Sequence, residues 1–431
     1  MDTANLYKIF KENPFISTDT RNLPKGCIFF ALKGPSFNGN QFALQALKDG
    51  ASYAVVDEDI ATNSDKIIRV ENVLKSLQSL ARYHREQFNI PVIAITGTNG
   101  KTTSKELIRE TLSTKYKTLA TEGNLNNHIG VPLTLLKIKK EHEIAIIEMG
   151  ANHIGEIADL CEIALPNHGL ISNVGTAHLE GFHSFENIVK TKTDLYRFLE
   201  KNEGTIFVRK EHSILLQNIT GDKIEYSTKD KNCFVYGNGE TKNNRLVIHL
   251  ENKKTTQTIH SQLIGTYNTE NILAAVSIGL FFNVPIEQIV SAIENYQPSN
   301  NRSQFLETKR NKLILDAYNA NPSSLKLAIN NFLELEEKEK VFIIGSMLEL
   351  GEASQQEHQK IIELLAQQKY TCYFVGKEFT ETAKNTKAIH FHFYPTSNEL
   401  ILSNELDKIN NKLILLKGSR GIQLEKLVPY L

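Results

Sequence analysis

Short apolar runs alternate with stretches of helical periodicity along most of the 431-residue chain. Between about residues 90 and 297 the apolar runs are VIAIT, AIIEMG, GLISNVG and TIFV. Alternation of this kind predicts βαβ units and a largely parallel sheet, whose ligands bind at the carboxyl ends of the strands. Between about residues 220 and 265, shorter and more polar runs such as RLVIHL and TQTIHSQLI predict an antiparallel insertion or edge.

Further α/β patterns flank this segment on both sides. Before it, CIFFAL (Cys27–Leu32) and YAVV (Tyr53–Val56) predict strands around a helix at Gln41–Lys48. After it, the cluster QPSNNRSQ (Gln297–Gln304) predicts a linker. The alternation then restarts with LILDAYNANP, VFIIGSM, CYFVG, HFHFY and LILLKGSR. We therefore predict an α/β protein of three domains: a small N-terminal α/β domain (1–89), a central domain (90–297) and a C-terminal Rossmann-like domain (298–431).

Composition narrows the class of protein. Lys plus Arg and Asp plus Glu number 49 each, so the net charge favours neither nucleic acid nor an anionic membrane as partner. No apolar run approaches the roughly 18 residues of a membrane span, and Met1–Phe15 lacks a signal-peptide core, so we expect a cytoplasmic protein. The cysteines are interpreted as core residues or incidental thiols, because their spacing fits neither zinc nor a disulfide framework; they are Cys27, Cys161, Cys233 and Cys372.

The segment Val92–Thr103, VIAITGTNGKTT, carries the clearest chemistry. A buried strand that runs into such a turn and then opens a helix presents backbone N–H groups to a phosphate. The turn has the short form Gly97-x-x-Gly100-Lys101-Thr102, because Ile95 stands where the general pattern has Gly. Lys101 is predicted to reach the outer phosphates, and Thr102 to offer its hydroxyl to magnesium. The central domain is therefore predicted to be P-loop ATPase-like, with a mostly parallel sheet and a nucleotide triphosphate site.

Polar residues follow two other predicted strands of the central domain. Glu148 ends the run AIIEMG, and His178 lies just beyond ISNVG. Both belong on the rim that carries the phosphate loop, where a carboxylate and an imidazole can orient a divalent metal around a triphosphate. The alternatives are a helix-capping acid and a structural histidine. We expect a functional pair, because both residues are placed on the same rim.

The segment SFENIVKTKTDLYRFL predicts an amphipathic helix with Ile188, Leu195 and Leu199 on its buried face. Spacing alone places Lys190 and Lys192 on the solvated face of this helix. From the pattern itself, neither lysine has a predicted role in chemistry.

A set of motifs stands in order along the chain: TGTNGKTT, EGNLNNHIGVPLTLL, EMGANHIGEI, ISNVGTAHLEGF, LIGTYNTENILAAV, LILDAYNANP and LLKGSRG. In order and spacing they resemble the Mur ligase family of peptidoglycan precursor synthesis, and the resemblance covers essentially the whole chain. DAYNANP resembles the branch that adds D-alanyl-D-alanine, and the Asp-Asn-Pro-Arg motif of the branch that adds the third residue is absent. The resemblance implies a monomeric ATP-dependent ligase that acts through an acyl phosphate. Its substrates would be UDP-N-acetylmuramoyl-tripeptide and D-alanyl-D-alanine.

The same resemblance implies roles for the predicted site residues. Lys101, Glu148, His178 and Lys192 would form the catalytic set. Thr102 and Glu148 would bind one magnesium, and His178 with a carbamylated Lys192 would support a second, because carbamylation turns a cation into an oxygen ligand. Asn268 and Asn271 would contact adenine, while Arg302 and Asp316 of the last domain would complete the ATP site by domain closure. The full ATP-binding set is Gly97, Thr98, Asn99, Gly100, Lys101, Thr102, Thr103, Asn268, Asn271, Arg302 and Asp316.

Substrate residues are implied in both outer domains. In the first domain the UDP-muramoyl end would be bound by Thr18, Asp19, Thr20, Arg21 and the loop Lys33–Asn40, with Lys33 and Gly34. D-alanyl-D-alanine would lie near Asn319 and Asn321, whose alternative is a turn and helix N-cap before PSSLKLAI. Lys417, Ser419 and Arg420 follow the last strong strand and would meet a substrate carboxylate or phosphate, or form a surface loop. The chain departs from many relatives at Ser346, where Asp is common, and in NGNQF, where His is common.

Three other functions are consistent with parts of the pattern. A sibling Mur ligase or a folylpolyglutamate synthase-like enzyme would keep the fold and change the substrate. A P-loop switch or ATPase would release phosphate without an acceptor amine. A non-catalytic scaffold would have no reason to keep Lys101, Thr102, Glu148 and His178 together.

Overall fold

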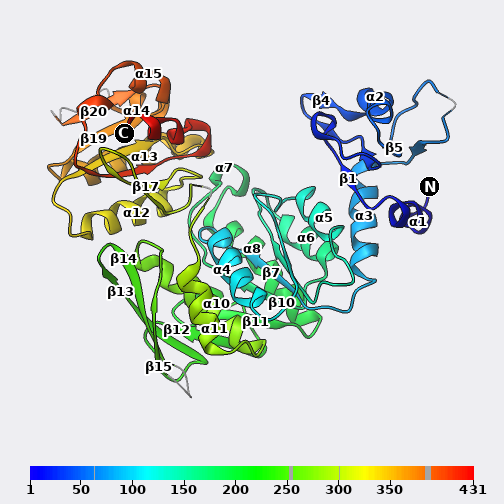
Figure 1. Ribbon diagram of the computed structural model, residues 1–431, viewed down its shortest axis with the longest axis horizontal. Helices are drawn as coiled ribbons and strands as arrows, with labels where there is room; N and C mark the ends of the chain where they lie inside the picture. Colours follow the sequence, from blue (N-terminus) through cyan, green and yellow to red (C-terminus); the bar gives the residue numbers. More distant parts are fainter. Residues whose placement is uncertain (63, 252–255, 300, 384–389) are drawn as a thin grey trace.

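The computed structural model describes residues 1–62, 64–251, 256–299, 301–383 and 390–431. The chain forms an N-terminal, a central and a C-terminal unit, each built on its own α/β sheet, and the two outer units lie apart on opposite sides of the central one (Figure 1). The predicted α/β fold is thereby confirmed. Within the described residues no helix is both long and apolar enough to cross a bilayer.

The N-terminal unit carries a parallel sheet of order β1-β2-β5-β6. The strands expected in CIFFAL and YAVV and the helix expected near Gln41–Lys48 are present. Helix α3 connects this unit to the central one, because its Leu77 and Leu80 belong to one apolar core with Val131 and Ile147. The elements are α1 (Thr3–Glu12), β1 (Ile16–Ser17), β2 (Ile28–Phe30), β3 (Lys33–Gly34), β4 (Phe37–Asn38), α2 (Ala43–Lys48), β5 (Tyr53–Val56), β6 (Ile67–Arg69) and α3 (Val73–Arg85).

The central sheet has the order β15-β14-β13-β12-β11-β10-β7-β9-β8. All residues of β7 and β9 are buried, as expected for strands covered on both faces. The elements are β7 (Val92–Thr96), α4 (Lys101–Ser113), β8 (Thr118–Ala120), α5 (Gly130–Leu135), β9 (Ile144–Glu148), α6 (Glu156–Ala164), β10 (His168–Ile171), α7 (Leu179–Phe182), α8 (Phe185–Lys201), β11 (Thr205–Arg209), α9 (Ser213–Leu216), β12 (Lys223–Ser227), β13 (Val235–Lys242), β14 (Arg245–Glu251), β15 (Thr256–His260), α10 (Thr269–Phe281) and α11 (Ile286–Asn295).

The antiparallel edge predicted for residues 220–265 is present only in part. Strands β13, β14 and β15 are antiparallel to one another, as expected. Strand β12, however, pairs parallel with both β11 and β13 and so continues the parallel sheet. Polarity was a poor guide here because β12 lies inside the sheet, between β11 and β13, although its first three residues are exposed or only partly buried. Residues 252–255 of this segment lie outside the described residues.

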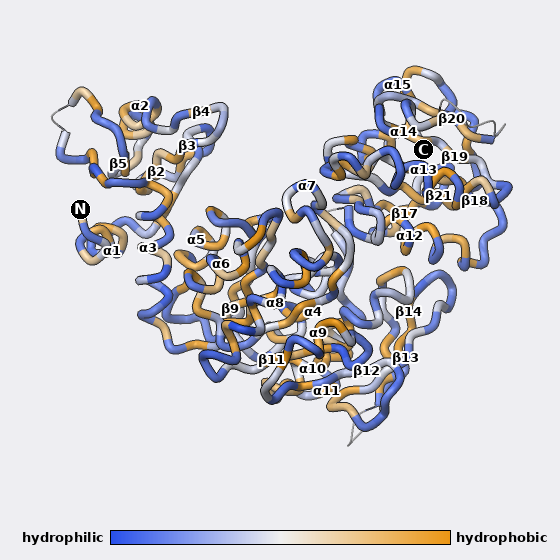
Figure 2. Tube along the Cα trace, turned by 180° about the vertical axis from the view of Figure 1, so that it is seen from behind, coloured by the Kyte–Doolittle hydropathy of each residue, from blue (hydrophilic) through white to orange (hydrophobic). Residues whose placement is uncertain are grey.

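The C-terminal sheet has the order β16-β17-β21-β18-β19-β20, in which only the edge strand β16 is antiparallel among the described strands. Apolar cores lie on both faces of this sheet, and the trace near the β21 label is hydrophobic in Figure 2. Residue 300 of the predicted linker lies outside the described residues. The elements are β16 (Gln304–Glu307), β17 (Lys312–Asp316), α12 (Pro322–Glu334), β18 (Lys340–Gly345), α13 (Ser354–Ala366), β19 (Thr371–Val375), α14 (Lys377–Thr382), β20 (Phe391–Tyr394), α15 (Ser397–Leu402) and β21 (Leu413–Lys417).

Candidate active site

A cavity of about 500 Å³ lies where the central and C-terminal units meet. Strand β7 lies between β9 and β10, so the carboxyl ends of these three strands bring the phosphate loop, Glu148 and the ISNVG segment together. The C-terminal unit adds the segment that follows β17. The predicted residues that line the cavity are Gly97, Thr98, Asn99, Gly100, Lys101, Thr102, Thr103, Glu148, His178, Lys192, Asn268, Asn271, Arg302, Asp316, Asn319, Asn321 and Lys417.

The phosphate loop is held from behind by the segment after β10. Asn173 binds the backbone of Asn99 on both sides: its Oδ1 accepts from Asn99 N at 2.9 Å, and its Nδ2 donates to Asn99 O at 3.0 Å. Gly97 has φ +145°, and a Cβ there would lie 2.0 Å from Ser172 Oγ. Gly100 has φ +77° directly before α4 begins. The glycines are therefore required by backbone shape and close packing, and the loop leads into a helix N-terminus suited to an anion.

Lys101 is folded back onto its own loop. Its Nζ donates to Gly97 O at 2.8 Å and to Thr98 O at 3.1 Å. Burial lowers the pKa of Lys101, while the nearby Glu148 carboxylate opposes that shift. The ammonium thus lies at the cavity with its hydrogen bonds made to carbonyl oxygens, the same kind of acceptor that a phosphate supplies.

Glu148 is 1% exposed at the end of β9. Its Oε1 accepts from Thr102 Oγ1 at 3.1 Å and from Asn126 Nδ2 at 2.8 Å, while Oε2 is buried with no partner among the described residues. A buried carboxylate oxygen without a partner is costly unless a ligand satisfies it. Hard divalent cations prefer carboxylate and hydroxyl oxygens, so this pair fits magnesium. No cluster of three or more His, Cys, Asp or Glu suited to a metal occurs in the described ranges.

Spacing alone placed Lys190 and Lys192 on the solvated face of α8, and this interpretation was wrong for Lys192. Lys190 is exposed as expected, but Lys192 is 3% exposed and its Nζ donates to Gly97 O at 3.2 Å. The reason is tertiary: α8 packs with this position beneath the phosphate loop, where the carbonyl oxygen of Gly97 accepts a hydrogen bond from Nζ. Burial and the neighbouring Lys101 hold the pKa of Lys192 well below its usual value.

His178 faces the C-terminal unit. Its Nδ1 lies 2.5 Å from Oε2 of Glu349, in the loop after β18. Both residues have left-handed backbone, with φ +50° at His178 and +64° at Glu349. Burial lowers the pKa of His178, and Glu349 opposes that shift. The imidazole thus lies on the predicted rim and also joins the two units.

The two asparagines predicted to contact adenine are buried, and their amides already have protein partners. Asn271 accepts from Ser104 Oγ at 3.0 Å and donates to Asn268 Oδ1 at 2.9 Å. Asn268 in turn donates to Ile264 O at 2.8 Å. Both residues therefore support the wall of the cavity next to α4, and their contact with a base stays a prediction.

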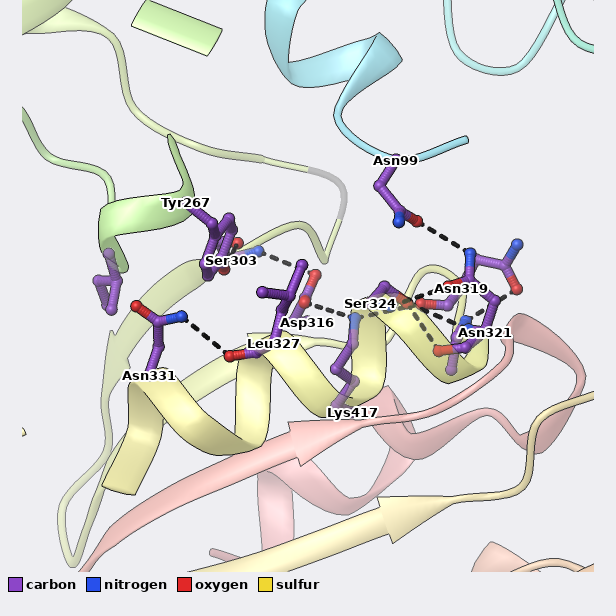
Figure 3. Close-up of polar contacts among 12 residues, drawn as sticks. Asn99, Tyr267, Ser303, Asp316, Asn319, Asn321, Ser324, Leu327, Asn331 and Lys417 are labelled. Carbon is purple, nitrogen blue, oxygen red and sulfur yellow. Dashed lines mark hydrogen bonds and ion pairs between the residues drawn. The ribbon is translucent and has the colours of Figure 1, made fainter. Parts of the chain in front are cut away.

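Residues from the C-terminal unit form the opposite wall (Figure 3). The Arg302 guanidinium lies 3.6 Å from the ring centroid of Tyr318. Lys417 was placed after the last strand, but it is the final residue of β21, and its Nζ binds Asp316 Oδ2 at 2.6 Å. This pairing follows from the parallel register of β17 and β21, which places the two residues side by side.

Asn321 has the capping role that was the alternative to substrate binding. It is the N-cap of α12 in a capping box with Ser324. Its Nδ2 also donates to Asn99 Oδ1 at 2.9 Å (Figure 3), while Asn99 Nδ2 donates to Ser323 Oγ at 3.1 Å. The phosphate loop of one unit and the start of a helix in the other are therefore in direct contact.

The remaining predicted substrate residues lie elsewhere, and within the described residues none of them lines the cavity. Ser419 is buried and accepts from Leu348 N, and Arg420 is exposed with its guanidinium 5.5 Å from the Tyr318 ring centroid. In the N-terminal unit, Arg21 binds Asp19, and Lys33 binds Asp57 and Glu58. The N-terminal candidates are Thr18, Asp19, Thr20, Arg21, Lys33 and Gly34.

Some residues that shape the site were not singled out from the sequence. Asn126 holds Glu148, Asn173 holds the phosphate loop, and Glu349 meets His178. Asn126 and Asn173 lie inside motifs that were recognised, EGNLNNHIG and ISNVG, so the motifs pointed to the right segments. Glu349 lies on another unit, and no local pattern links it to His178.

Family models match most of the central and C-terminal units. The Mur ligase middle domain matches residues 95–279, and the glutamate ligase domain of Mur ligases matches residues 301–420. The chain belongs to the Mur ligase family. As a Mur ligase it is 31% identical over 430 residues to UDP-N-acetylmuramoyl-tripeptide--D-alanyl-D-alanine ligase of Bacillus subtilis, covering 96% of this chain and 92% of the relative. It is 32% identical to the enzyme of the same name from Escherichia coli, again over 96% and 92%.

Solved structures agree with this membership. A crystal structure of MurF from Acinetobacter baumannii superposes with a TM-score of 0.86 at 31% identity, covering 96% of this Mur ligase and 92% of that chain. MurF from Thermotoga maritima, solved in complex with ADP, superposes with a TM-score of 0.85 at 25% identity and 97% coverage of both chains. Folylpolyglutamate synthase of Mycobacterium tuberculosis, at 10% identity and a TM-score of 0.64, shares the fold.

Proposed function

We propose that this Mur ligase joins D-alanyl-D-alanine to UDP-N-acetylmuramoyl-tripeptide at the expense of ATP, in the synthesis of peptidoglycan precursors. The observation that carries the proposal is the cavity that the phosphate loop, Glu148 and Lys192 line together with residues of the DAYNANP segment of the C-terminal unit. Curated relatives with this activity in their names cover nearly the whole chain, which favours this substrate over a sibling ligase or a folate substrate. We also propose that the enzyme acts as a cytoplasmic monomer.

The proposed division of labour follows the three units, with bounds 1–89, 90–297 and 298–431. The first would bind the UDP-muramoyl end through Thr18–Arg21 and the Lys33–Asn40 loop, and the second would bind ATP. The third would bind the dipeptide near Asn319 and Asn321 and contact the nucleotide through Arg302 and Asp316. In the present arrangement Asp316 is paired with Lys417, so a ribose hydroxyl would share or replace that partner.

The proposed chemistry has two steps. In the first, a carboxylate oxygen of the tripeptide attacks the γ-phosphorus of ATP, the bond to the β-phosphate oxygen breaks, and ADP leaves. In the second, the amine of the dipeptide attacks the carbonyl carbon of the acyl phosphate, inorganic phosphate leaves, and the nitrogen loses a proton. Lys101 would move from its loop carbonyls to the transferred phosphoryl oxygens, where its charge offsets the charge that gathers there.

Magnesium fits the oxygen pair of Thr102 and Glu148, since Glu148 Oε2 is buried without a partner among the described residues. We propose that these two residues hold one cation, and that His178 and Lys192 support a second. Bound there, magnesium would neutralise phosphate charge. Asn126 orients Glu148 from outside the site, and His178 would have to release Glu349 to serve a cation.

Carbamylation of Lys192 is the third part of this proposal. The reaction with carbon dioxide needs the neutral amine, and burial together with Lys101 lowers the pKa of Lys192 in that direction. Lys192→Ala is expected to lower kcat by about ten- to a hundredfold, because a residue that positions the metal region is lost. The matched control is Lys190→Ala on the exposed side of the same helix, which should match the parent. Partial rescue of Lys192→Ala by a short carboxylic acid supports the carbamate, whereas activity equal to the parent contradicts any role in the site.

The deciding experiment measures phosphate release from ATP and magnesium by the purified protein. UDP-N-acetylmuramoyl-tripeptide and D-alanyl-D-alanine are added singly and then together. The UDP-linked product is identified by its mass in mass spectrometry. Release that requires both substrates, with a UDP-linked pentapeptide as product, supports the proposed ligase. Release that ignores the dipeptide overturns the acceptor assignment and favours an ATPase or a sibling ligase.

A further inference from the structure

Asn99 of the phosphate loop is hydrogen-bonded both to the central unit and to the C-terminal unit. The backbone of Asn99 is fixed to the central unit by Asn173, and Ser172 Oγ adds a bond to Asn99 O at 2.6 Å. The side chain of the same residue points the other way, to the C-terminal unit, where it binds Asn321 and Ser323. Asn99 was expected to contact ATP, but its side-chain oxygen and nitrogen are both hydrogen-bonded to residues of the C-terminal unit.

The three residues form a closed set of hydrogen bonds, which we name the Asn99 cluster: Asn99, Asn321 and Ser323. Asn321 Nδ2 donates to Asn99 Oδ1, Asn99 Nδ2 donates to Ser323 Oγ, and Ser323 Oγ donates to Asn321 Oδ1 at 2.9 Å. Each side chain both gives and receives, so the geometry is specific. Asn321 is also the N-cap of α12, so the cluster fixes the first turn of that helix relative to the phosphate loop.

The position of the cluster in the chain gives it a consequence for the reaction. Asn321 follows Asp316 and Asn319 on the same short segment, whose far end is anchored by the bond between Lys417 and Asp316. Lys417 Nζ also donates to Asn319 O at 3.3 Å. The segment is thus fastened at one end to the C-terminal sheet and at the other to the loop that receives the phosphates.

We propose that Asn99 is a positioning residue that sets the DAYNANP segment, and with it the acceptor dipeptide, at a fixed place relative to the phosphate loop. The dipeptide part rests on the proposed function, whereas the link between the units does not. The amine must meet an acyl phosphate formed at the phosphate loop, so small displacements of this segment cost rate. The loss should therefore appear in kcat/KM for the dipeptide rather than in affinity for ADP.

The first experiment tests the link without using the reaction. Hydrogen exchange is followed in a peptide that covers the phosphate loop, where the amides of Thr98 and Asn99 are hydrogen-bonded. Ser323→Ala, a change in the other unit, is expected to raise exchange in this peptide by about two- to tenfold, the range for one lost hydrogen bond. The matched control is Ser324→Ala, which removes the two bonds that Ser324 Oγ makes to the backbone of Asn321 in the capping box but removes no bond to Asn99. Equal exchange in Ser323→Ala and parent, or equal increases in both variants, overturns the link.

The second experiment is a double-mutant cycle in kcat/KM for D-alanyl-D-alanine. Ser323→Ala is expected to lower this value by about two- to tenfold in the parent. In an Asn99→Ala background the same change should cost less than about twofold, because the bond from Asn99 to Ser323 is already gone and only the bond from Ser323 to Asn321 is left to lose. Affinity of Ser323→Ala for ADP, measured by calorimetry, should stay within about twofold of the parent, since the phosphate loop keeps its backbone partners. Equal costs in both backgrounds overturn the positioning role.

The two experiments separate the proposals. If the parent makes no pentapeptide, the proposed function fails, and the exchange experiment still decides whether the Asn99 cluster links the units. If pentapeptide forms and exchange rises, but kcat/KM for the dipeptide is unchanged, the link exists and the positioning role is wrong.

Discussion

Lys101→Ala is expected to lower kcat for pentapeptide synthesis by on the order of a thousandfold, because phosphoryl transfer depends mainly on electrostatic stabilisation and positioning. Lys101 is the cation at the start of α4, and its Nζ already lies among the loop carbonyls next to the proposed phosphate site. Removing the ammonium leaves the charge of the transferred phosphoryl group without the cation that we propose for it at the phosphate loop. The measurement is coupled-enzyme kinetics with all three substrates saturating.

A matched control shows whether the loss is specific. Lys115→Ala removes an exposed lysine just beyond the other end of α4, where Nζ donates to Asn283 O at 2.8 Å. It should retain activity close to the parent. A Lys101→Ala enzyme that is folded by circular dichroism and keeps more than about a tenth of the parent kcat would remove Lys101 from the chemistry.

Glu148→Gln is the second change with a large expected effect, a fall of about a hundredfold in kcat/KM for the magnesium complex of ATP. Gln keeps the shape and one acceptor for Thr102 and Asn126, but it loses the negative charge that favours a divalent cation. The second amide position would also place an N–H where the unpartnered Oε2 now lies. We therefore expect the fall in kcat/KM to come from weaker binding of the metal, with the fold intact.

The effect of Glu148→Gln on metal binding can be measured in the absence of catalysis. With ADP present, Mn²⁺ binding followed by electron paramagnetic resonance should weaken by about tenfold or more in Glu148→Gln. Glu122→Gln is the control, because Glu122 is an exposed carboxylate bound to Lys137. Parent-like Mn²⁺ affinity in Glu148→Gln would show that the cation binds elsewhere.

The phosphate loop and the sheet around it could be predicted from sequence because their causes are local. An apolar strand, a turn with two glycines and a helix start all lie within Val92–Thr103, and the strand and the helix were found as expected. The burial of Lys192 could not be inferred from spacing, because helical periodicity shows only which side chains are apolar. It does not record that a buried polar side chain has found a carbonyl in another segment, here Gly97 O.

Contacts between the central and C-terminal units could not be predicted from the sequence pattern either. Asn99 and Asn321 are 222 residues apart, and His178 and Glu349 are 171 apart. Each of these residues has an adequate local explanation: a turn residue, a helix cap or a loop acid. Only the packing of one sheet unit on another gives them partners. Lys417 is similar, since its pairing with Asp316 depends on which strands are neighbours in the C-terminal sheet.

The resting place of Lys101 has a consequence for inhibitor chemistry. Two uncharged carbonyl oxygens accept hydrogen bonds from its ammonium, so we expect that a compound that competes with ATP need not carry a phosphate in order to bind it. A neutral molecule with two carbonyl acceptors at matching separation would avoid the poor membrane permeation of a polyanion. Binding that is competitive with ADP in calorimetry, and lost in Lys101→Ala, would establish the principle. Binding that is unchanged in Lys101→Ala would refute it.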